Sequence, residues 1–252
     1  MTIAKRAFPF QTKRRELRDP DQDPNFGTPD WGNRHVAEVL PQGCWTGHPC
    51  VIVGGGPSFE AFDAFRLKGW RTIGVNRAFI RFEPTIVFSM DTRYLNWLLA
   101  GQYGVSEKLH FLTLRSYRVW HLVRPATLPG EYYYAQGYRG AINALDSVSL
   151  RLEEGLGTGA NSGYGALNLA VLLGAAPIYL LGFDCSHTPN GRTHWHAGHP
   201  VSQTQRHLNA FISHFTAAAR EFKRLARGPI INLSRGTALR CFDLGDPEEV
   251  FQ

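Results

Sequence analysis

Four of the ten histidines in this 252-residue chain lie in one short segment, residues 184–199. They are His187, His194, His196 and His199, and Asp184 precedes them. Because histidine titrates near neutral pH, it can act as a general base that removes a proton from a substrate hydroxyl. We take His199, His194 and Asp184 as the candidate catalytic residues, with Asp184 orienting a histidine or holding a ribose hydroxyl.

The same segment also contains enough ligand types for a metal site, because His194 and His196 are spaced as H-x-H. A Gly/Pro-rich loop gives this spacing no fixed geometry, and no paired cysteines or H-E-x-x-H motif accompany it. We therefore assign no metal ligand. Structural loop histidines remain the alternative to a catalytic histidine.

A glycine-rich turn follows an apolar segment near residue 50. Residues 50–53 are mostly β-branched and predict a buried strand, and aromatic residues at helical spacing follow the turn. A strand, a glycine turn and a helix start together form an anion cradle, because free N–H groups and the positive helix end meet there. The predicted nucleotide-binding residues of the turn are Gly54, Gly55, Gly56, Pro57 and Ser58.

The spacing of these glycines is neither the Walker pattern nor the dinucleotide G-x-G-x-x-G. It predicts a ligand that carries phosphate and argues against a P-loop ATPase or a standard NAD enzyme. The alternative is a tight strand-to-helix turn with no ligand.

Polar or glycine residues also end other predicted strands, at Asn76, Asp91 and Gly182. The carboxyl ends of parallel strands share one edge, where open α/β sheets bind ligands. Asp91 has two interpretations. It is a carboxylate for a metal-bound diphosphate, as in D-x-D glycosyltransferases, or a cap for the next helix.

A second anion cradle is predicted where residues 157–163 lead into a helix. Asn161 or Ser162 could cap that helix and also contact a carboxylate or phosphate. Plain helix capping is the alternative. With Gly163, these residues complete the predicted nucleotide-binding set.

Apolar strands alternate with helical patterns from residue 50 onward, which predicts a doubly wound, mostly parallel, Rossmann-like α/β sheet with helices on both faces. The predicted strands are 50–54, 71–76, 85–90, 108–114, 177–183 and 229–233. The predicted helices are 58–67, 94–100, 161–173 and 202–226. Ser202 and Gln205 resemble a capping box for the last helix, from whose apolar stripe His207 and His214 lie apart.

Three regions are expected along the chain. Residues 1–45 are rich in charge and proline and predict an irregular N-terminal arm, which could contact a neighbouring subunit in a homo-oligomer. Residues 46–252 predict the Rossmann-like nucleotide-binding transferase domain. Residues 116–155 fit the alternation poorly and are expected to be an insertion or lid.

The formal charge of +6 suits a nucleotide, an acidic sugar or a nucleic acid without choosing among them. No apolar run reaches the roughly 20 residues of a membrane span, and the first residues lack the apolar core of a signal peptide. We therefore expect a cytoplasmic protein with no membrane span. The four cysteines are scattered, and Cys50 is expected to be a buried free thiol.

Several motifs, in their order along residues 50–242, resemble one superfamily. It joins the 6-hydroxymethylpterin diphosphokinase-like proteins, the motility-accessory glycosyltransferases and the bacterial sialyltransferases of the Campylobacter type. Some members are encoded by phages, and this compact chain is similar to those. The segments that carry the resemblance are 51–58, 74–76, 83–91, 161–163, 178–184 and 231–242.

The resemblance to the sialyltransferases implies particular roles. The glycine turn and Asn76 would hold a cytidine nucleotide, residues 161–163 would bind the donor's phosphate or carboxylate, and His199 would be the general base. Two positions depart from the family pattern, since Asn161 replaces a threonine and Phe183 an isoleucine. The tyrosines that assist the leaving group have no clear counterpart.

The function implied is a sialyltransferase-like glycosyltransferase that uses a CMP- or UDP-linked sugar donor and a small-molecule or glycan acceptor, without a strict need for Mg²⁺. If the chain is phage-encoded, it would work in the host cytoplasm. The first alternative is a diphosphokinase that uses Mg-ATP and a hydroxymethyl heterocycle such as a pterin, with Asp91 or Asp184 as metal ligands. The second is a non-catalytic nucleotide-binding or virion-associated protein. A nucleic acid acceptor rests on the basic charge alone.

Overall fold

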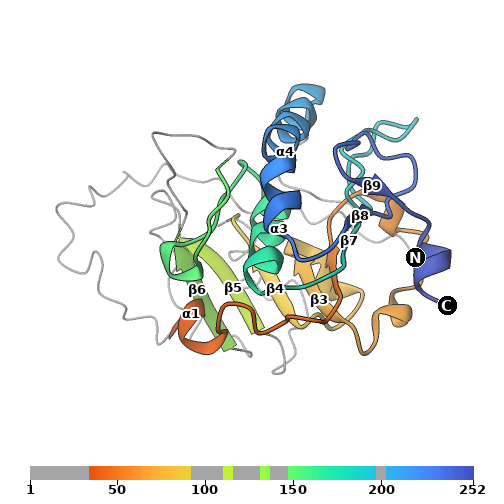
Figure 1. Ribbon diagram of the computed structural model, residues 1–252. Coiled ribbons are helices and arrows are strands. Elements are labelled where there is room, and N and C mark those ends of the chain that lie inside the picture. The colour runs from red at the N-terminus through yellow and green to blue at the C-terminus, as the bar shows by residue number, and fades with distance from the viewer. Residues whose placement is uncertain (1–33, 92–109, 116–130, 137–146, 197–202) are drawn as a thin grey trace, which may run out of the picture. The chain divides into compact units, whose positions relative to one another are not determined.

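The computed structural model describes residues 34–91, 110–115, 131–136, 147–196 and 203–252. Their strands form one nine-stranded, fully parallel sheet in the order β1-β6-β5-β4-β3-β2-β7-β8-β9 (Figure 1). The strands are β1 (Arg34–His35), β2 (Cys50–Val53), β3 (Arg71–Val75), β4 (Ile86–Ser89), β5 (His110–Arg115), β6 (Glu131–Gln136), β7 (Ile178–Leu181), β8 (Ile230–Asn232) and β9 (Asp243–Leu244). The expected α/β, mostly parallel, Rossmann-like fold is confirmed.

The strand order reverses next to β2. The chain runs outward from β2 through β3, β4 and β5 to β6, and then returns to place β7 on the other side of β2. Val53 of β2 pairs with Leu181 of β7. The residues that follow them, Gly54 and Gly182, therefore lie side by side at the carboxyl edge of the sheet. This reversal is the place where an open α/β sheet binds ligands.

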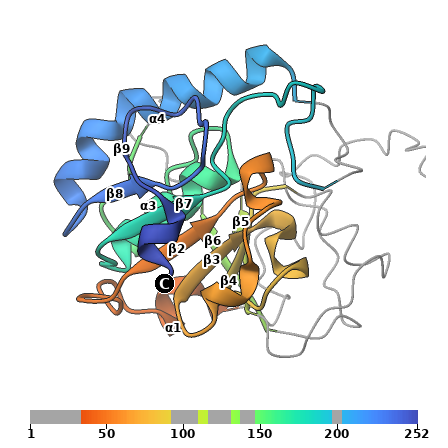
Figure 2. The same cartoon turned by 90° about the vertical axis from the view of Figure 1, so that its right-hand side faces the viewer.

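Two helices cover one face of the sheet. They are α3 (Ser162–Leu172) and α4 (Gln205–Leu225), and Figure 2 shows α4 running across α3, which lies between it and the strands. Nearly all of α3 is buried, whereas α4 buries only an apolar stripe that includes Leu208, Phe215 and Phe222. Because α3 is buried on nearly all sides, it has no polar face.

A second apolar core covers the opposite face. The alternation of side chains along β2 sends Cys50 and Ile52 into the core under α3, and Val51 and Val53 into the second core. The second core is closed by short elements. They are η1 (Pro57–Phe59), η2 (Ala64–Leu67), η3 (Asn76–Ile80) and α5 (Pro247–Val250). Two further short elements, α1 (Val36–Val39) and η4 (Leu152–Glu154), do not belong to this core.

The prediction of a helix over residues 58–67 is wrong. Two short 3₁₀ turns occupy this segment instead, and Phe59 and Phe62 both pack into the second core. Phe65 does not continue that face and is 86% exposed. The start of the last helix also differs from expectation. Thr204 caps α4 and forms a capping box with His207, while Ser202 lies outside the described residues, as does the predicted helix 94–100.

The sheet extends further along the chain than the sequence predicts. β1 and α1 belong to residues assigned above to the N-terminal arm, and Trp45 is buried in the main core. β6 lies within the predicted insertion and pairs with both β1 and β5. A two-residue strand carries no periodic pattern, which is why β1 escapes prediction. Residues 1–33 lie outside the described part.

Cys50 is a buried free thiol, as expected, and burial raises its pKa. No helix in the described ranges is long and apolar enough to cross a membrane.

Candidate functional site

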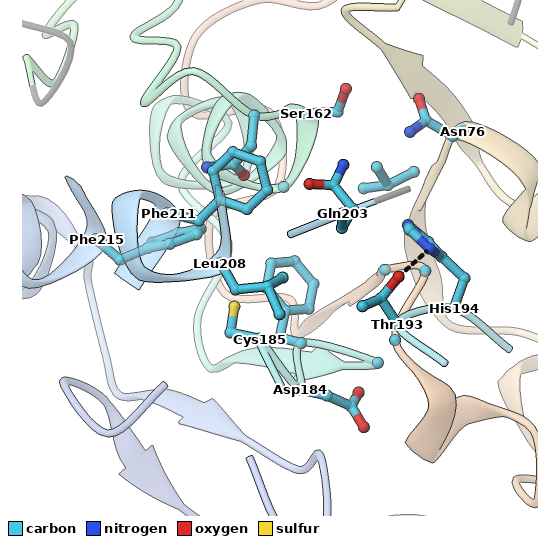
Figure 3. A pocket seen from close by; sticks show the side chains of 18 of the residues that line it. Asn76, Ser162, Asp184, Cys185, Thr193, His194, Gln203, Leu208, Phe211 and Phe215 are labelled. Carbon is cyan, nitrogen blue, oxygen red and sulfur yellow. Dashed lines mark hydrogen bonds between the residues drawn. The ribbon is translucent and has the colours of Figure 1, made fainter. Parts of the chain in front are cut away.

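A cavity of about 500 Å³ lies at the carboxyl edge of the sheet, where the strand order reverses (Figure 3). It gathers residues that the sequence predicts for the site from six separate segments. They are Gly54, Gly55, Gly56, Asn76, Asp91, Asn161, Ser162, Gly163, Gly182, Asp184 and His194. Pro57 and Ser58 do not line it, and His199 lies outside the described residues.

The glycine turn offers few free donors, contrary to expectation. The N–H of Gly54 donates to Leu181 O at 2.7 Å, and the N–H of Gly56 donates to Gly182 O at 2.8 Å. Ser58 N–H donates to the Asp184 carboxylate at 2.8 Å. η1 is also a single 3₁₀ turn and has no helix dipole to offer. Gly55 is thus left as the residue of this turn whose N–H could meet a ligand.

Packing against β7 explains why glycines occupy this turn. A Cβ on Gly54 would lie 2.5 Å from Gly182 O, and one on Gly56 would lie 2.6 Å from the same oxygen and overlap the Asp184 carboxylate. A Cβ on Gly55 would approach the His194 ring at 3.0 Å. The glycines therefore let two strand ends and the histidine loop approach one another closely.

Asp184 is bonded to the glycine turn and not to a histidine of the described segment. Its carboxylate accepts two hydrogen bonds from Ser58, one from the backbone and one from the hydroxyl, each 2.8 Å long. Burial raises the pKa of this carboxyl, while the two Ser58 donors oppose the shift. Asp184 thus joins the glycine turn to the end of β7.

The ends of β3 and β4 are joined by a polar chain. The hydroxyl of Ser89, at the end of β4, donates to Asn76 Oδ1 at 2.8 Å and accepts from Asp91 N–H at 3.0 Å. Asn76 has a φ of 52°, a left-handed conformation that asparagine tolerates better than most residues. These bonds hold Asn76 and Asp91 at the cavity wall.

The start of α3 presents the helix end that the sequence predicts. Asn161 caps the helix by accepting from Tyr164 N–H at 2.8 Å, and Ser162 Oγ accepts from Met90 N–H at 3.0 Å. The N–H groups of Ser162 and Gly163 belong to the first turn, where no helical carbonyl can accept them. Both residues line the cavity, so that the positive end of α3 faces it.

The histidine segment folds over the glycine turn. Trp195 N–H donates to Gly55 O at 3.0 Å, and its indole packs edge-on against Phe59 with centroids 5.9 Å apart. This places His194 at the cavity, with Nδ1 2.9 Å from Thr193 Oγ1. His196 lies 3.0 Å from an Arg77 nitrogen.

His187 has a separate position. Its two ring nitrogens contact Gln205 and the carbonyl of Gln203, each at 3.1 Å, and so join the histidine segment to the start of α4. Of the histidines in the described part of this segment, His194 is the one that faces the cavity.

Metal-binding capacity is limited in the described part of the chain. No group of three or more His, Cys, Asp or Glu residues there could hold a metal ion. The set of His194, His196 and Asp184 with His199 is not tested, because His199 lies outside the described residues.

The charges of the cavity wall are acidic. Among described residues, Asp91 and Asp184 line it, and no lysine or arginine does. Among the described lining residues, the backbone N–H groups at the start of α3 are therefore the best-placed donors for an anion.

One wall of the cavity is not foreseen by the sequence. Leu208, Phe211 and Phe215 of α4 line it, together with Cys185 and Gln203. The apolar stripe of α4 predicts that Leu208, Phe211 and Phe215 are buried, but it does not tell whether each packs in the core or lines the cavity. The partial exposure of Phe211, which lies on the same face of α4 as the buried Phe215, is what separates the two.

The fold and this cavity define a Rossmann-like α/β protein with a cavity at the carboxyl edge of its sheet. No protein-family model matches the chain, and no curated protein matches it in sequence. Among solved structures, a Maf glycosyltransferase from Magnetospirillum magneticum AMB-1 has a similar fold, with a TM-score of 0.52 and 19% sequence identity. The match covers 82% of this chain and 35% of the other, so this chain spans about a third of that protein's length.

Proposed function

We propose that this chain is a nucleotide-sugar-dependent glycosyltransferase of the sialyltransferase-like type. The observation that carries the proposal is the cavity at the strand reversal, where the start of α3, Asn76 and His194 meet. The fold shared with a Maf glycosyltransferase supports the same class. The donor would be a CMP- or UDP-linked sugar, and the acceptor a hydroxyl on a small molecule or glycan.

The start of α3 is the place for the donor's anionic group. Ser162 and Gly163 would donate their backbone N–H groups to a phosphate or carboxylate, and the helix dipole would stabilise the negative charge. Asn76 and the N–H of Gly55 would contact the nucleoside. Because the described wall lacks cations, a ligand with one phosphate charge suits it better than a diphosphate.

A histidine would act as the general base. When Nδ1 of His194 donates to Thr193 Oγ1, Nε2 carries the lone pair and can take a proton from the acceptor hydroxyl. The acceptor oxygen then forms its bond to the anomeric carbon, the bond from that carbon to the donor phosphate breaks, and the nucleotide leaves. His199, to which the family resemblance assigns this role, is the competing candidate.

A thermal-shift panel tests the class of ligand. CMP, UMP and UDP, without metal, are each compared with Mg-ATP on the full chain. We expect CMP or UDP to raise the melting temperature by about 5–10 °C at about 100 times its Kd. No shift with any nucleotide would contradict the proposal and favour a non-catalytic binding protein.

The diphosphokinase is the second candidate because Asp91 lines the cavity and could hold a magnesium ion. Asp184, the other expected ligand, already accepts two bonds from Ser58, and Asp91 is the second carboxylate of the described wall. Stabilisation by Mg-ATP alone in the same panel would favour this reaction over sugar transfer.

A further inference from the structure

Phe211 presents a half-buried aromatic ring to the cavity and makes no ring contact with the described residues. Phe215, one turn further along α4, behaves differently. It is 1% exposed and packs against Tyr164, Phe183 and Phe242 with ring centroids 5.3, 6.2 and 6.1 Å away. The same face of α4 therefore serves the core at Phe215 and the cavity at Phe211.

The side chains labelled around the cavity differ in polarity (Figure 3). Leu208 and Phe211 lie on the α4 side, while Asn76, Thr193 and His194 lie on the opposite side. Neither Leu208 nor Phe211 has a side-chain atom that can form a hydrogen bond. When an apolar group of a ligand covers such apolar side chains, water is displaced from both surfaces and binding becomes more favourable.

We infer that the acceptor carries an apolar group next to its reactive hydroxyl and that Leu208 and Phe211 bind this group. The inference rests on the proposed function. The polarity of the lining residues indicates which substrate lies there: the nucleotide needs hydrogen-bonding groups such as those of Gly55, Asn76 and the start of α3, whereas Leu208 and Phe211 offer none. Phe211 is the partly exposed member of the α4 wall, so this wall reaches solvent, where a second substrate enters.

The inference is tested by titrating the full chain with methyl, butyl and octyl β-D-glucosides and galactosides, below their micelle concentrations. Within each sugar series the hydroxyls stay the same and only the apolar group grows. We expect butyl glycosides to bind about tenfold more tightly than methyl glycosides, since each buried CH₂ adds favourable transfer free energy. The titrations are repeated with CMP present, and CMP and UDP are titrated alone.

Two variants locate the effect. Phe211→Ser is expected to abolish the chain-length preference and leave the nucleotide Kd within twofold, whereas Phe211→Leu keeps most of the preference. Phe65→Ser is the matched control, because Phe65 is 86% exposed and lies outside the cavity wall. Phe65→Ser should leave the preference intact.

Equal binding of methyl, butyl and octyl glycosides by the unmodified chain overturns the inference, and this readout needs no variant. A loss of nucleotide affinity in Phe211→Ser also overturns it, because the wall would then hold the nucleoside. A Phe211-dependent preference in a chain that binds no nucleotide supports the apolar subsite and overturns the glycosyltransferase proposal instead.

Discussion

Asp184 and Ser58 lie 126 residues apart in the sequence and are joined by two hydrogen bonds of 2.8 Å. This contact fastens the glycine turn after β2 to the end of β7, across the point where the strand order reverses. It also gives Asp184 a role in positioning the turn, where the sequence suggests catalysis.

Replacing Asp184 with asparagine is expected to change how stability depends on pH. Burial raises the pKa of Asp184 in the folded protein, so the folded chain binds a proton more readily than the unfolded chain. Stability from this group is therefore greatest below the ordinary aspartate pKa of about 3.9, and it falls as pH rises through the higher folded pKa. The amide of the D184N variant would have no such dependence and could still bond to Ser58.

Urea unfolding at several pH values, starting near pH 4, measures this effect. The free energy of unfolding of the unmodified chain, minus that of D184N, should decrease as pH rises. The exposed cap variant Asp63→Asn controls for the removal of a carboxylate elsewhere. A difference that stays constant or increases with pH would show that Asp184 does not have a raised pKa.

Alanine substitutions at two adjacent glycines should separate folding from ligand binding. A Cβ on Gly56 would meet backbone at Gly182 O, so Gly56→Ala should cost about 2–3 kcal/mol of unfolding free energy. A Cβ on Gly55 would meet only the His194 ring, which can shift. Gly55→Ala should therefore lower stability by less than about 1 kcal/mol but weaken nucleotide binding. Chemical denaturation and calorimetry measure the two effects. Equal stability losses would refute this account of the turn.

A carboxylate at position 161 should affect binding more than stability. Aspartate caps a helix as well as asparagine does and interacts favourably with the helix dipole, which offsets the loss of the 2.9 Å bond from the Asn161 amide to Gly159 O, so Asn161→Asp should change the melting temperature little. The added charge would lie beside the predicted phosphate site and should weaken nucleotide binding at least about tenfold. Asn190→Asp adds the same charge at an exposed loop position outside the cavity wall. If both variants weaken binding equally, the start of α3 is not the anion site.

Single substitutions should identify the general base. Whichever of His194→Ala and His199→Ala removes the base should reduce kcat by about 100- to 10,000-fold while nucleotide affinity stays within about twofold. The exposed residue His48 provides the control, since His48→Ala should leave turnover unchanged. Turnover is measured under saturating donor, once the donor is known from the nucleotide panel. Full activity in both variants would exclude a histidine base at either position.

Much of the fold follows from local pattern. The buried strand at β2, the apolar helix α3 with its Asn161 cap and the stripe of α4 all follow from hydrophobic periodicity and capping residues. The prediction of a helix over residues 58–67 fails because tertiary packing overrides the local pattern: Phe59 and Phe62 pack into the second core, while Phe65, the next residue of the pattern, is exposed. β1 and β6 are missed because pairing within the sheet, and not local periodicity, makes them strands.

The sequence by itself determined that the residues after β2, β3, β4 and β7 meet at the carboxyl edge of the sheet, because strand ends can be read from where apolar runs stop. Only the tertiary structure decided what those residues do. The N–H groups of Gly54, Gly56 and Ser58 donate to the end of β7 and to Asp184, which leaves the start of α3 as the donor-rich end of the cavity. Likewise, whether Phe211 faces the core or the cavity depends on what packs against α4. Hydrogen bonds and burial between distant segments have no signature in local spacing.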